Sequence, residues 1–280
     1  MQMCQKAKRG SYKMEKNGKT FIKGLVIGAT MTVPGVSGGS MAMVLGIYDR
    51  LLKHVSEITK YPKESLTFLL WFAAGAGSGA FLFSRGISWL LTTRAEGILC
   101  FFFLGAVSGG IPMILKSASV SRIRGREMIC ILTGILTALL IALIPQGIFA
   151  PGTENTPMHL LFQLAGGFII AVALVLPGIS ASQMLYMLGI YESTLKAISS
   201  LDILALLPLA VGGILGTYLT ARILEQLIKK HREDTFLIIL GFMLVSLRSL
   251  LPEHLIEENL LAGVGALVLG FVSLYFLSAK

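Results

Sequence analysis

The chain has 280 residues, of which 54% are hydrophobic and only 14% are charged; its mean hydropathy is +0.77. Soluble domains usually carry about 25% charged residues, so the composition excludes an ordinary water-soluble protein. The net charge of +9 does not indicate a nucleic-acid partner, because the basic residues lie in short segments beside apolar runs, where they orient membrane helices.

Apolar segments recur from residue 21 to the C-terminus, and about 20 residues of helix cross the roughly 30 Å of hydrocarbon in a bilayer. The first half is predicted to hold a basic N-terminus at 1–19, an interrupted region at 21–50, a loop at 50–65, and segments at 66–92, 97–115 and 128–149. The second half is predicted to hold an interrupted region at 159–196 and segments at 203–228, 235–251 and 259–279. These runs are continuous rather than alternating, so the sequence predicts an all-α polytopic membrane protein.

An internal repeat relates the two halves. PGVSGGS at 34–40 returns as PGISASQ at 177–183, and LGIYD at 45–49 returns as LGIYE at 188–192, with one offset of 143 residues. The pattern G-x3-G-x5-R that begins at Gly75 returns at Gly212, an offset of 137. We therefore assign residues 20–150 to a first repeat and 151–280 to a second.

The two interrupted regions are expected to be re-entrant hairpins. Proline and glycine break each helix, which leaves arms of about 15 residues, or roughly 20 Å, too short to cross alone. With re-entrant hairpins, the cytoplasmic side holds seven Lys and Arg near the N-terminus, four in 50–65, four in 116–127, three in 229–232 and Lys280, which is 19 of the 24. With spanning regions, the split is 12 inside and 10 outside. The positive-inside rule favours the hairpins.

This topology leaves three spans in each repeat. Because three is an odd number, the two halves have opposite orientations, and both termini are cytoplasmic. The sequence thus predicts an inverted repeat with broken helices at mid-membrane, an architecture that recurs in transporters.

The residues after each break are candidates for binding an anion. The first N–H groups of a helix lack intrahelical partners and carry the positive end of the helix dipole, so they favour an anion, particularly phosphate. Small residues let a ligand approach the backbone, and hydroxyls add donors. The predicted substrate-binding residues in these segments are Gly35, Ser37, Gly38, Gly39, Ser40, Gly178, Ser180, Ser182 and Gln183.

Arg85 and Arg222 are also predicted to bind the substrate. Each lies about two-thirds of the way along a long apolar segment, where a guanidinium costs at least about 2.5–3.5 kcal/mol to insert. A phosphate at mid-membrane would compensate that cost by bidentate pairing, whereas snorkelling to the headgroups is the structural alternative. Glu225, Asp49 and Glu192 are candidates for charge compensation or proton coupling.

No catalytic or metal-binding constellation is evident. The G-x-S-x-G match at Gly35 resembles a hydrolase nucleophile elbow, but the second copy loses the last glycine and no histidine lies in an apolar segment. Cys4, Cys100 and Cys130 are scattered and form no ligand spacing. We therefore expect no metal, no cofactor and no enzymatic activity.

The duplicated motifs resemble those of the bacterial polyprenyl-phosphate (undecaprenyl phosphate) translocase family, PopT, formerly a membrane family of unknown function. The resemblance extends from about Thr20 over nearly the whole chain. It implies a flippase in the bacterial plasma membrane that returns undecaprenyl phosphate from the outer to the cytoplasmic leaflet, for recycling in cell-wall synthesis. The motif residues that carry over are Pro34, Gly35, Ser37, Gly38 and Gly39, and Pro177, Gly178 and Ser180.

Other functions remain open at this point. An intramembrane polyprenyl-diphosphate phosphatase could use re-entrant serines and an arginine, but it would need acidic residues for metal or proton transfer. A channel would need a continuous polar pore. The oligomeric state is not legible from the sequence.

Overall fold

The computed structural model describes residues 17–33, 35–91, 93, 96–120, 124–145, 147, 157–200, 202–251 and 260–278. Every regular element within these ranges is a helix. Four helices are long and apolar enough to cross a membrane, namely Pro62–Ile87, Glu96–Ser117, Gly125–Ala142 and Ile203–Lys230. The expected all-α, multi-pass membrane fold is therefore confirmed.

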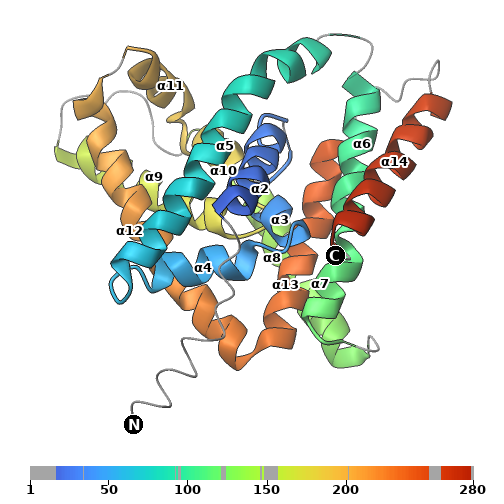
Figure 1. Cartoon of the computed structure of the whole chain (residues 1–280). Helices are drawn as coiled ribbons and strands as arrows, with labels where there is room; N and C mark the ends of the chain where they lie inside the picture. Colours follow the sequence, from blue (N-terminus) through green and yellow to red (C-terminus); the bar gives the residue numbers. More distant parts are fainter. Residues whose placement is uncertain are drawn as a thin grey trace.

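The described residues of the first half form seven helices (Figure 1). They are α2 (Asn17–Thr30), α3 (Gly38–Val44), α4 (Tyr48–Ser56), α5 (Pro62–Leu91), α6 (Glu96–Gly109), α7 (Ile111–Ser117) and α8 (Gly125–Ala142). Two features differ from the expected elements. Part of the expected loop at 50–65 is helical, because α4 buries Tyr48 and Leu52. The segment expected at 97–115 is divided at Gly110, two residues before Pro112.

The second half repeats this order. It contains α9 (Pro157–Val175), α10 (Ala181–Leu188), α11 (Tyr191–Ser199), α12 (Ile203–Lys230), α13 (Arg232–Ser246) with the short 3-10 helix η1 (Leu247–Leu250), and α14 (Leu260–Ser278). The 143-residue offset maps α3 and α4 onto α10 and α11. Offsets of 137 and 136 map α5 and α6 onto α12 and α13.

The two breaks have matching backbones. Gly35 and Gly178 have φ angles of 85° and 89°, in the left-handed region that strains any residue with a Cβ. Ser37 and Ser180 follow as the N-cap residues of α3 and α10, with φ/ψ of −87°/131° and −90°/124°. The second arms are shorter than the expected 15 residues, since α3 has 7 and α10 has 8.

Glycines bring one helix pair into backbone contact within each half. A Cβ on Gly75 of α5 would overlap the carbonyl oxygen of Phe21 in α2. In the second half, a Cβ on Gly212 of α12 would overlap the carbonyl oxygen of Leu164 in α9. Gly75 and Gly212 are matched by the repeat, as are Phe21 and Leu164, so the same close packing occurs twice.

The last helix of each half packs on the other half. A Cβ on Gly105 of α6 would overlap the carbonyl oxygen of Leu267 in α14, and a Cβ on Gly241 of α13 would overlap that of Ile131 in α8. These two contacts are related by the 136-residue offset. The halves therefore exchange their final helices, with α14 against α6 and α8 against α13.

Matched helices run in opposite directions. In Figure 1, α5 runs from the lower to the upper end of the molecule, whereas α12 runs from the upper to the lower end. Hydrogen bonds fix these ends: α4 contacts both the start of α5, through His54 and Ser65, and the end of α12, through Ser56 and Glu225. Similarly, α13 begins where α7 ends, because Arg232 donates to the Ser117 carbonyl at 2.7 Å.

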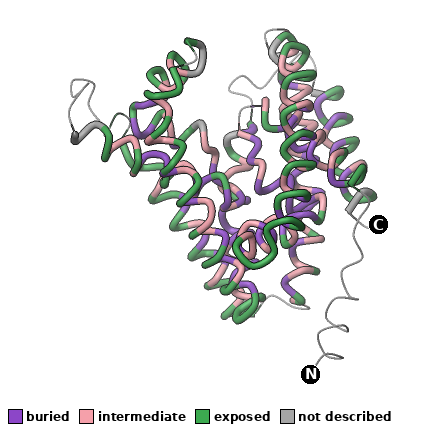
Figure 2. Tube along the Cα trace, turned by 60° about the vertical axis from the view of Figure 1, so that its left-hand side comes forward, coloured by how far each residue is buried: buried purple, intermediate pink, exposed green. Residues whose placement is uncertain are grey.

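Basic side chains gather at the lower end and apolar ones face outward. The ends of α7 and α12 and the starts of α5, α8 and α13 carry Lys63, Lys116, Arg124, Arg126, Lys229, Lys230 and Arg232. Outward positions of the long helices are exposed (Figure 2) and include Phe81, Ile214 and Leu261, with exposed fractions of 82%, 71% and 92%. Such a continuous apolar surface suits a helix bundle surrounded by lipid.

Candidate functional site

A cavity of about 320 Å³ lies where the second break meets α8 and η1. Its volume is within the range of small-molecule sites, about 300–1,000 Å³. Both breaks reach it, through Gly35 from the first and Gly178 from the second. The remaining lining residues are Ile179, Ser180, Gln183, Met184, Met187, Ala138, Leu139, Ile141, Ala142, Val245, Ser246 and Arg248.

The polar side of the cavity combines a helix start with a cation. Ser180 is the N-cap of α10, and Gln183 lies in its first turn. Arg248 enters from η1, is exposed, and forms no ion pair within the described part of the chain. A guanidinium facing the positive end of a helix dipole has no favourable partner there until an anion binds between them.

The other side of the cavity is apolar. Ala138, Leu139 and Ala142 come from the last turns of α8, and Met184 and Met187 come from α10. Methionine adapts its shape to flexible apolar ligands. One wall therefore suits an anionic group and the facing wall suits hydrocarbon, which is the division expected of a site for an amphiphile.

Arg248 is the residue that the sequence analysis missed. It lies inside the predicted apolar segment 235–251, but it is not among the predicted substrate-binding residues. The sequence does indicate it, because an arginine within an apolar segment is energetically costly and is by default a candidate functional residue.

The predicted residues of the second break lie together at the cavity. Gly178, Ser180 and Gln183 all line it. The side chain of Ser182 lies outside the described residues.

The predicted residues of the first break are mostly packed away. Of these, Gly35 alone lines the cavity. Ser37 and Ser40 are buried, with exposed fractions of 6% and 1%. Gly38 packs near the Met31 side chain, and a Cβ on Gly39 would lie 3.1 Å from the Pro177 backbone, so the two breaks touch.

The two predicted arginines lie away from the cavity lining. Arg85 is exposed on α5, and Arg222 is exposed on α12. Arg222 donates to the Tyr218 hydroxyl at 3.3 Å. Their assignment to the phosphate stays a prediction.

Two of the three acidic candidates make contacts at the basic end. Glu225 accepts from the Ser56 hydroxyl and pairs with Lys229 at 2.6 Å. Asp49 pairs with Arg232 at 3.2 Å. Glu192 is exposed on α11 at the opposite end of the molecule.

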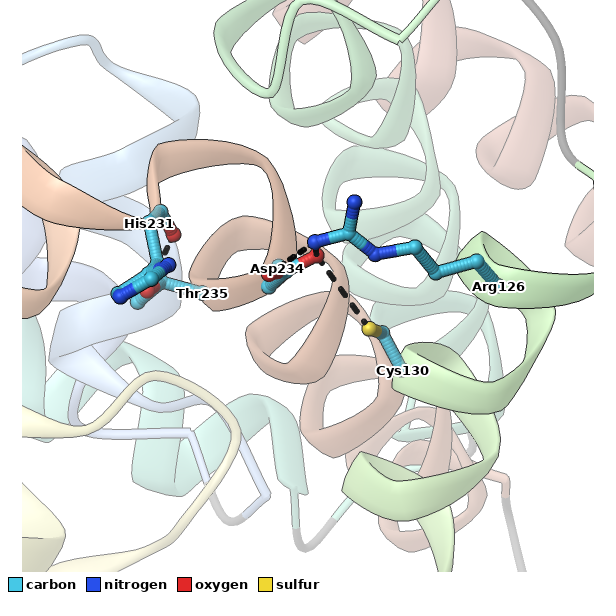
Figure 3. Close-up of polar contacts among 5 residues, drawn as sticks. All are labelled: Arg126, Cys130, His231, Asp234 and Thr235. Carbon is cyan, nitrogen blue, oxygen red and sulfur yellow. Dashed lines mark hydrogen bonds and ion pairs between the residues drawn. The ribbon is translucent and has the colours of Figure 1, made fainter.

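Polar contacts also join α8 to α13 at the basic end (Figure 3). Both carboxylate oxygens of Asp234 accept from the Arg126 guanidinium, at 3.0 and 2.8 Å, and the Cys130 thiol approaches the same carboxylate at 3.7 Å. In the next turn, the Thr235 hydroxyl donates to the His231 carbonyl at 2.7 Å. These contacts hold one end of each helix while the cavity lies at the other end.

His54 shows that the interface between α4 and α5 is dry. Its ring is 8% exposed and stacks on Phe68 with centroids 4.2 Å apart. Burial, with the neighbouring charges of Arg50 and Lys53, lowers the pKa of His54 from 6.5 to about 4. The imidazole is therefore neutral near pH 7.

Comparison with known proteins identifies the family. A family model described as VCA0040-like, undecaprenyl phosphate translocase-like, matches residues 27–267. That range covers both breaks and nearly all described helices. The chain belongs to this family.

Two relatives of this translocase-like family illustrate the similarity. A polyprenyl-phosphate transporter of Vibrio cholerae serotype O1 is 31% identical over 252 residues, which cover 83% of this chain and 77% of the relative. A polyprenyl-phosphate transporter of Staphylococcus aureus is 30% identical over 243 residues, which cover 83% and 85%. No solved structure matches the chain. Membership indicates a transporter rather than an enzyme, as expected, and leaves the phosphatase alternative without support.

Proposed function

We propose that this protein is a flippase that moves a polyprenyl phosphate, such as undecaprenyl phosphate, from the outer to the cytoplasmic leaflet of the bacterial plasma membrane. Transfer in this direction would recycle the lipid carrier of cell-wall synthesis. The observation that carries the proposal is the cavity, in which Arg248 faces the start of α10 across a space bounded by apolar side chains. The names of the two relatives support the choice of lipid.

In this proposal, the phosphate binds between η1 and α10. Arg248 pairs with its oxygens, and the Ser180 and Gln183 side chains and the first N–H groups of α10 donate hydrogen bonds. The first isoprenoid units lie along Ala138, Ala142 and Met187.

The outward orientation of the cavity follows from the position of charge. The start of α8 carries Arg124 and Arg126, whereas the cavity adjoins Ala138 and Ala142 at its end. Sixteen residues separate Arg126 from Ala142, a rise of about 24 Å. The positive-inside rule places the basic end in the cytoplasm, so the cavity opens toward the outer leaflet, where the substrate is collected.

We further propose that the two halves form an inverted repeat with re-entrant hairpins. The opposed directions of α5 and α12 and the duplicated glycine contacts support this arrangement. The lengths of the helices around the first break agree with it, because α2 and α3, with 14 and 7 residues, rise about 21 and 10 Å, and neither crosses alone. At the second break α10 is also short, with 8 residues, whereas α9 has 19.

Arg85 and Arg222 are proposed to act at the ends of the path rather than in the cavity. They occupy equivalent positions on helices of opposite direction, so each would meet the phosphate near a different membrane face. Glu225, Asp49 and Glu192 are proposed to compensate charge or couple protons while the site is empty.

The test is a leaflet-transfer assay with labelled undecaprenyl phosphate in proteoliposomes. A charge-assisted hydrogen bond contributes about 1.5–3 kcal/mol, so Arg248→Ala should reduce transfer about ten- to a hundredfold. Arg248→Lys should retain part of the rate, because it keeps the charge without the bidentate geometry. Arg126→Ala is the matched control, since Arg126 is an exposed arginine at the other end of the molecule.

Arg85→Ala and Arg222→Ala belong in the same experiment, and each is expected to lower transfer without preventing insertion. Wild-type rates in both would remove these arginines from the mechanism. Absence of transfer by the unmodified protein would refute the proposed function itself.

A further inference from the structure

The cavity is lined mainly by the second break, although the repeat gives the first break similar residues. Ser180, which is partly exposed, and Met184 and Met187, with exposed fractions of 8% and 6%, line the cavity. Their counterparts Ser37, Met41 and Val44, at the 143-residue offset, have exposed fractions of 6%, 1% and 0%. The two halves therefore differ most at the serines, since Ser180 is accessible at the cavity and Ser37 is buried.

The closed side is sealed by one direct contact. Gly110, between α6 and α7, packs against the side chain of Val44, and a Cβ at Gly110 would lie 3.1 Å from the Val44 Cβ. The counterparts of this pair are Met187 and Ser246, and both line the cavity instead. The Val44–Gly110 contact thus occupies, in the first half, the place at which Met187 and Ser246 line the cavity in the second.

Helix α4 reinforces the closed side. It packs on α12, where Ser56 donates to Glu225, and it reaches α13, where Asp49 pairs with Arg232. Its counterpart α11 packs on α12 and α10, and no comparable contact joins α11 to α5 in the described ranges. Helix α4 therefore packs against the other half, whereas α11 makes no comparable contact with it in the described ranges.

The closed side also holds an unsatisfied hydroxyl. The Ser40 Oγ is buried and has no hydrogen-bond partner among the described residues. A buried hydroxyl left unpaired is destabilising, because it loses its hydrogen bonds to water without gaining a partner in the protein. Its counterpart is Gln183, whose side chain lines the cavity. The first break thus has a polar side chain, Ser40, at the position equivalent to Gln183, and the Ser40 hydroxyl has no partner among the described residues in this conformation.

We propose that the first break opens as a second cavity for the same phosphate headgroup, facing the cytoplasm, when the two halves exchange conformations. This inference rests on the proposed function. In the exchanged state, Val44 separates from Gly110, α4 leaves α12, and the Ser40 hydroxyl donates to the ligand. At the same time, Met187 closes on Ser246, so the cavity described above disappears.

Two cysteine pairs test this exchange in a background with Cys4, Cys100 and Cys130 replaced by serine. Val44→Cys with Gly110→Cys reports the closed first break, because the Cβ separation is close to the roughly 3.5–4.5 Å of a disulfide. Met187→Cys with Ser246→Cys reports the exchanged state. Both pairs should oxidise in actively transporting protein, each disulfide should abolish transfer of labelled undecaprenyl phosphate, and reductant should restore it.

Two outcomes would overturn the inference: transfer at the parental rate with the first pair fully oxidised, or no disulfide at the second pair in a transporting protein. Ser40→Ala provides a further measurement without oxidation. It should slow transfer and leave thermal stability unchanged or raised, because it removes a hydroxyl that is unpaired only in the present conformation. Failure of the proposed function is separable, because it would abolish transfer by the unmodified protein while leaving the cross-linking pattern intact.

Discussion

The close glycine contact between α2 and α5 allows a stability prediction with an internal control. A Cβ on Gly75 would overlap the Phe21 carbonyl oxygen and lie 2.9 Å from its carbon and 3.0 Å from the Leu25 nitrogen. All three are backbone atoms of a helix, so no rotamer change can relieve the overlap. Two residues along the same helix, Gly77 has no neighbouring atom within 4 Å of its Cβ position.

Comparison of Gly75→Ala with Gly77→Ala isolates the packing effect. Alanine favours a helix by about 1 kcal/mol over glycine, and this gain is common to both variants. Overpacking costs about 1–3 kcal/mol, and only Gly75→Ala incurs it. Gly75→Ala should therefore be about 1–3 kcal/mol less stable than Gly77→Ala.

Thermal unfolding of the detergent-solubilised protein measures this difference, at about 2–4 °C per kcal/mol for a chain of this size. The repeat supplies an independent replicate in α12. Gly212 is blocked by the Leu164 carbonyl, whereas the atom nearest to a Cβ on the adjacent Gly213 is 3.9 Å away. Equal stability of Gly75→Ala and Gly77→Ala would show that these helices are not in backbone contact.

Two further predictions concern pH and topology. Stability should fall as the pH drops from about 6.5 toward 4, because His54, whose pKa is lowered from 6.5 to about 4 by burial and by Arg50 and Lys53, binds a proton more readily in the unfolded chain. In thermal melts, His54→Gln should reduce the dependence of the melting temperature on pH in this range. An unchanged pH dependence in the variant would show that His54 is not its source. Single cysteines at Lys60 and Ala197 should react with an impermeant thiol reagent from opposite faces of the membrane, and labelling of both from one face would exclude the inverted topology.

Much of the architecture could be predicted because close helix packing requires small residues at particular positions in the sequence. Backbone contact between helices tolerates only the smallest residues, so Gly75 and Gly212 stand at fixed distances from their arginines in both halves. The breaks could be recognised in the sequence for a similar reason, since a φ near +85° favours glycine at position 35 and again at position 178.

The position of the cavity could not be predicted in this way. Ser37 and Ser180 have similar neighbours in sequence and nearly the same backbone angles, yet one is buried and the other lines the cavity. The difference lies in contacts between distant helices, such as Val44 with Gly110. The short motif therefore does not tell which of the two breaks lines a cavity.

The exchanged final helices restrict which parts of the molecule can move. Helices α6 and α14, like α8 and α13, are joined by backbone contacts at Gly105 and Gly241, and these pairs link the two halves. Packed backbones separate or stay together and do not deform continuously, so each pair should move as a rigid body. The polar and side-chain contacts of α3 and α4, including Val44 with Gly110 and Ser56 with Glu225, are the ones that can break without separating either pair. Movement is then concentrated at the two breaks, which is where a transported headgroup must pass.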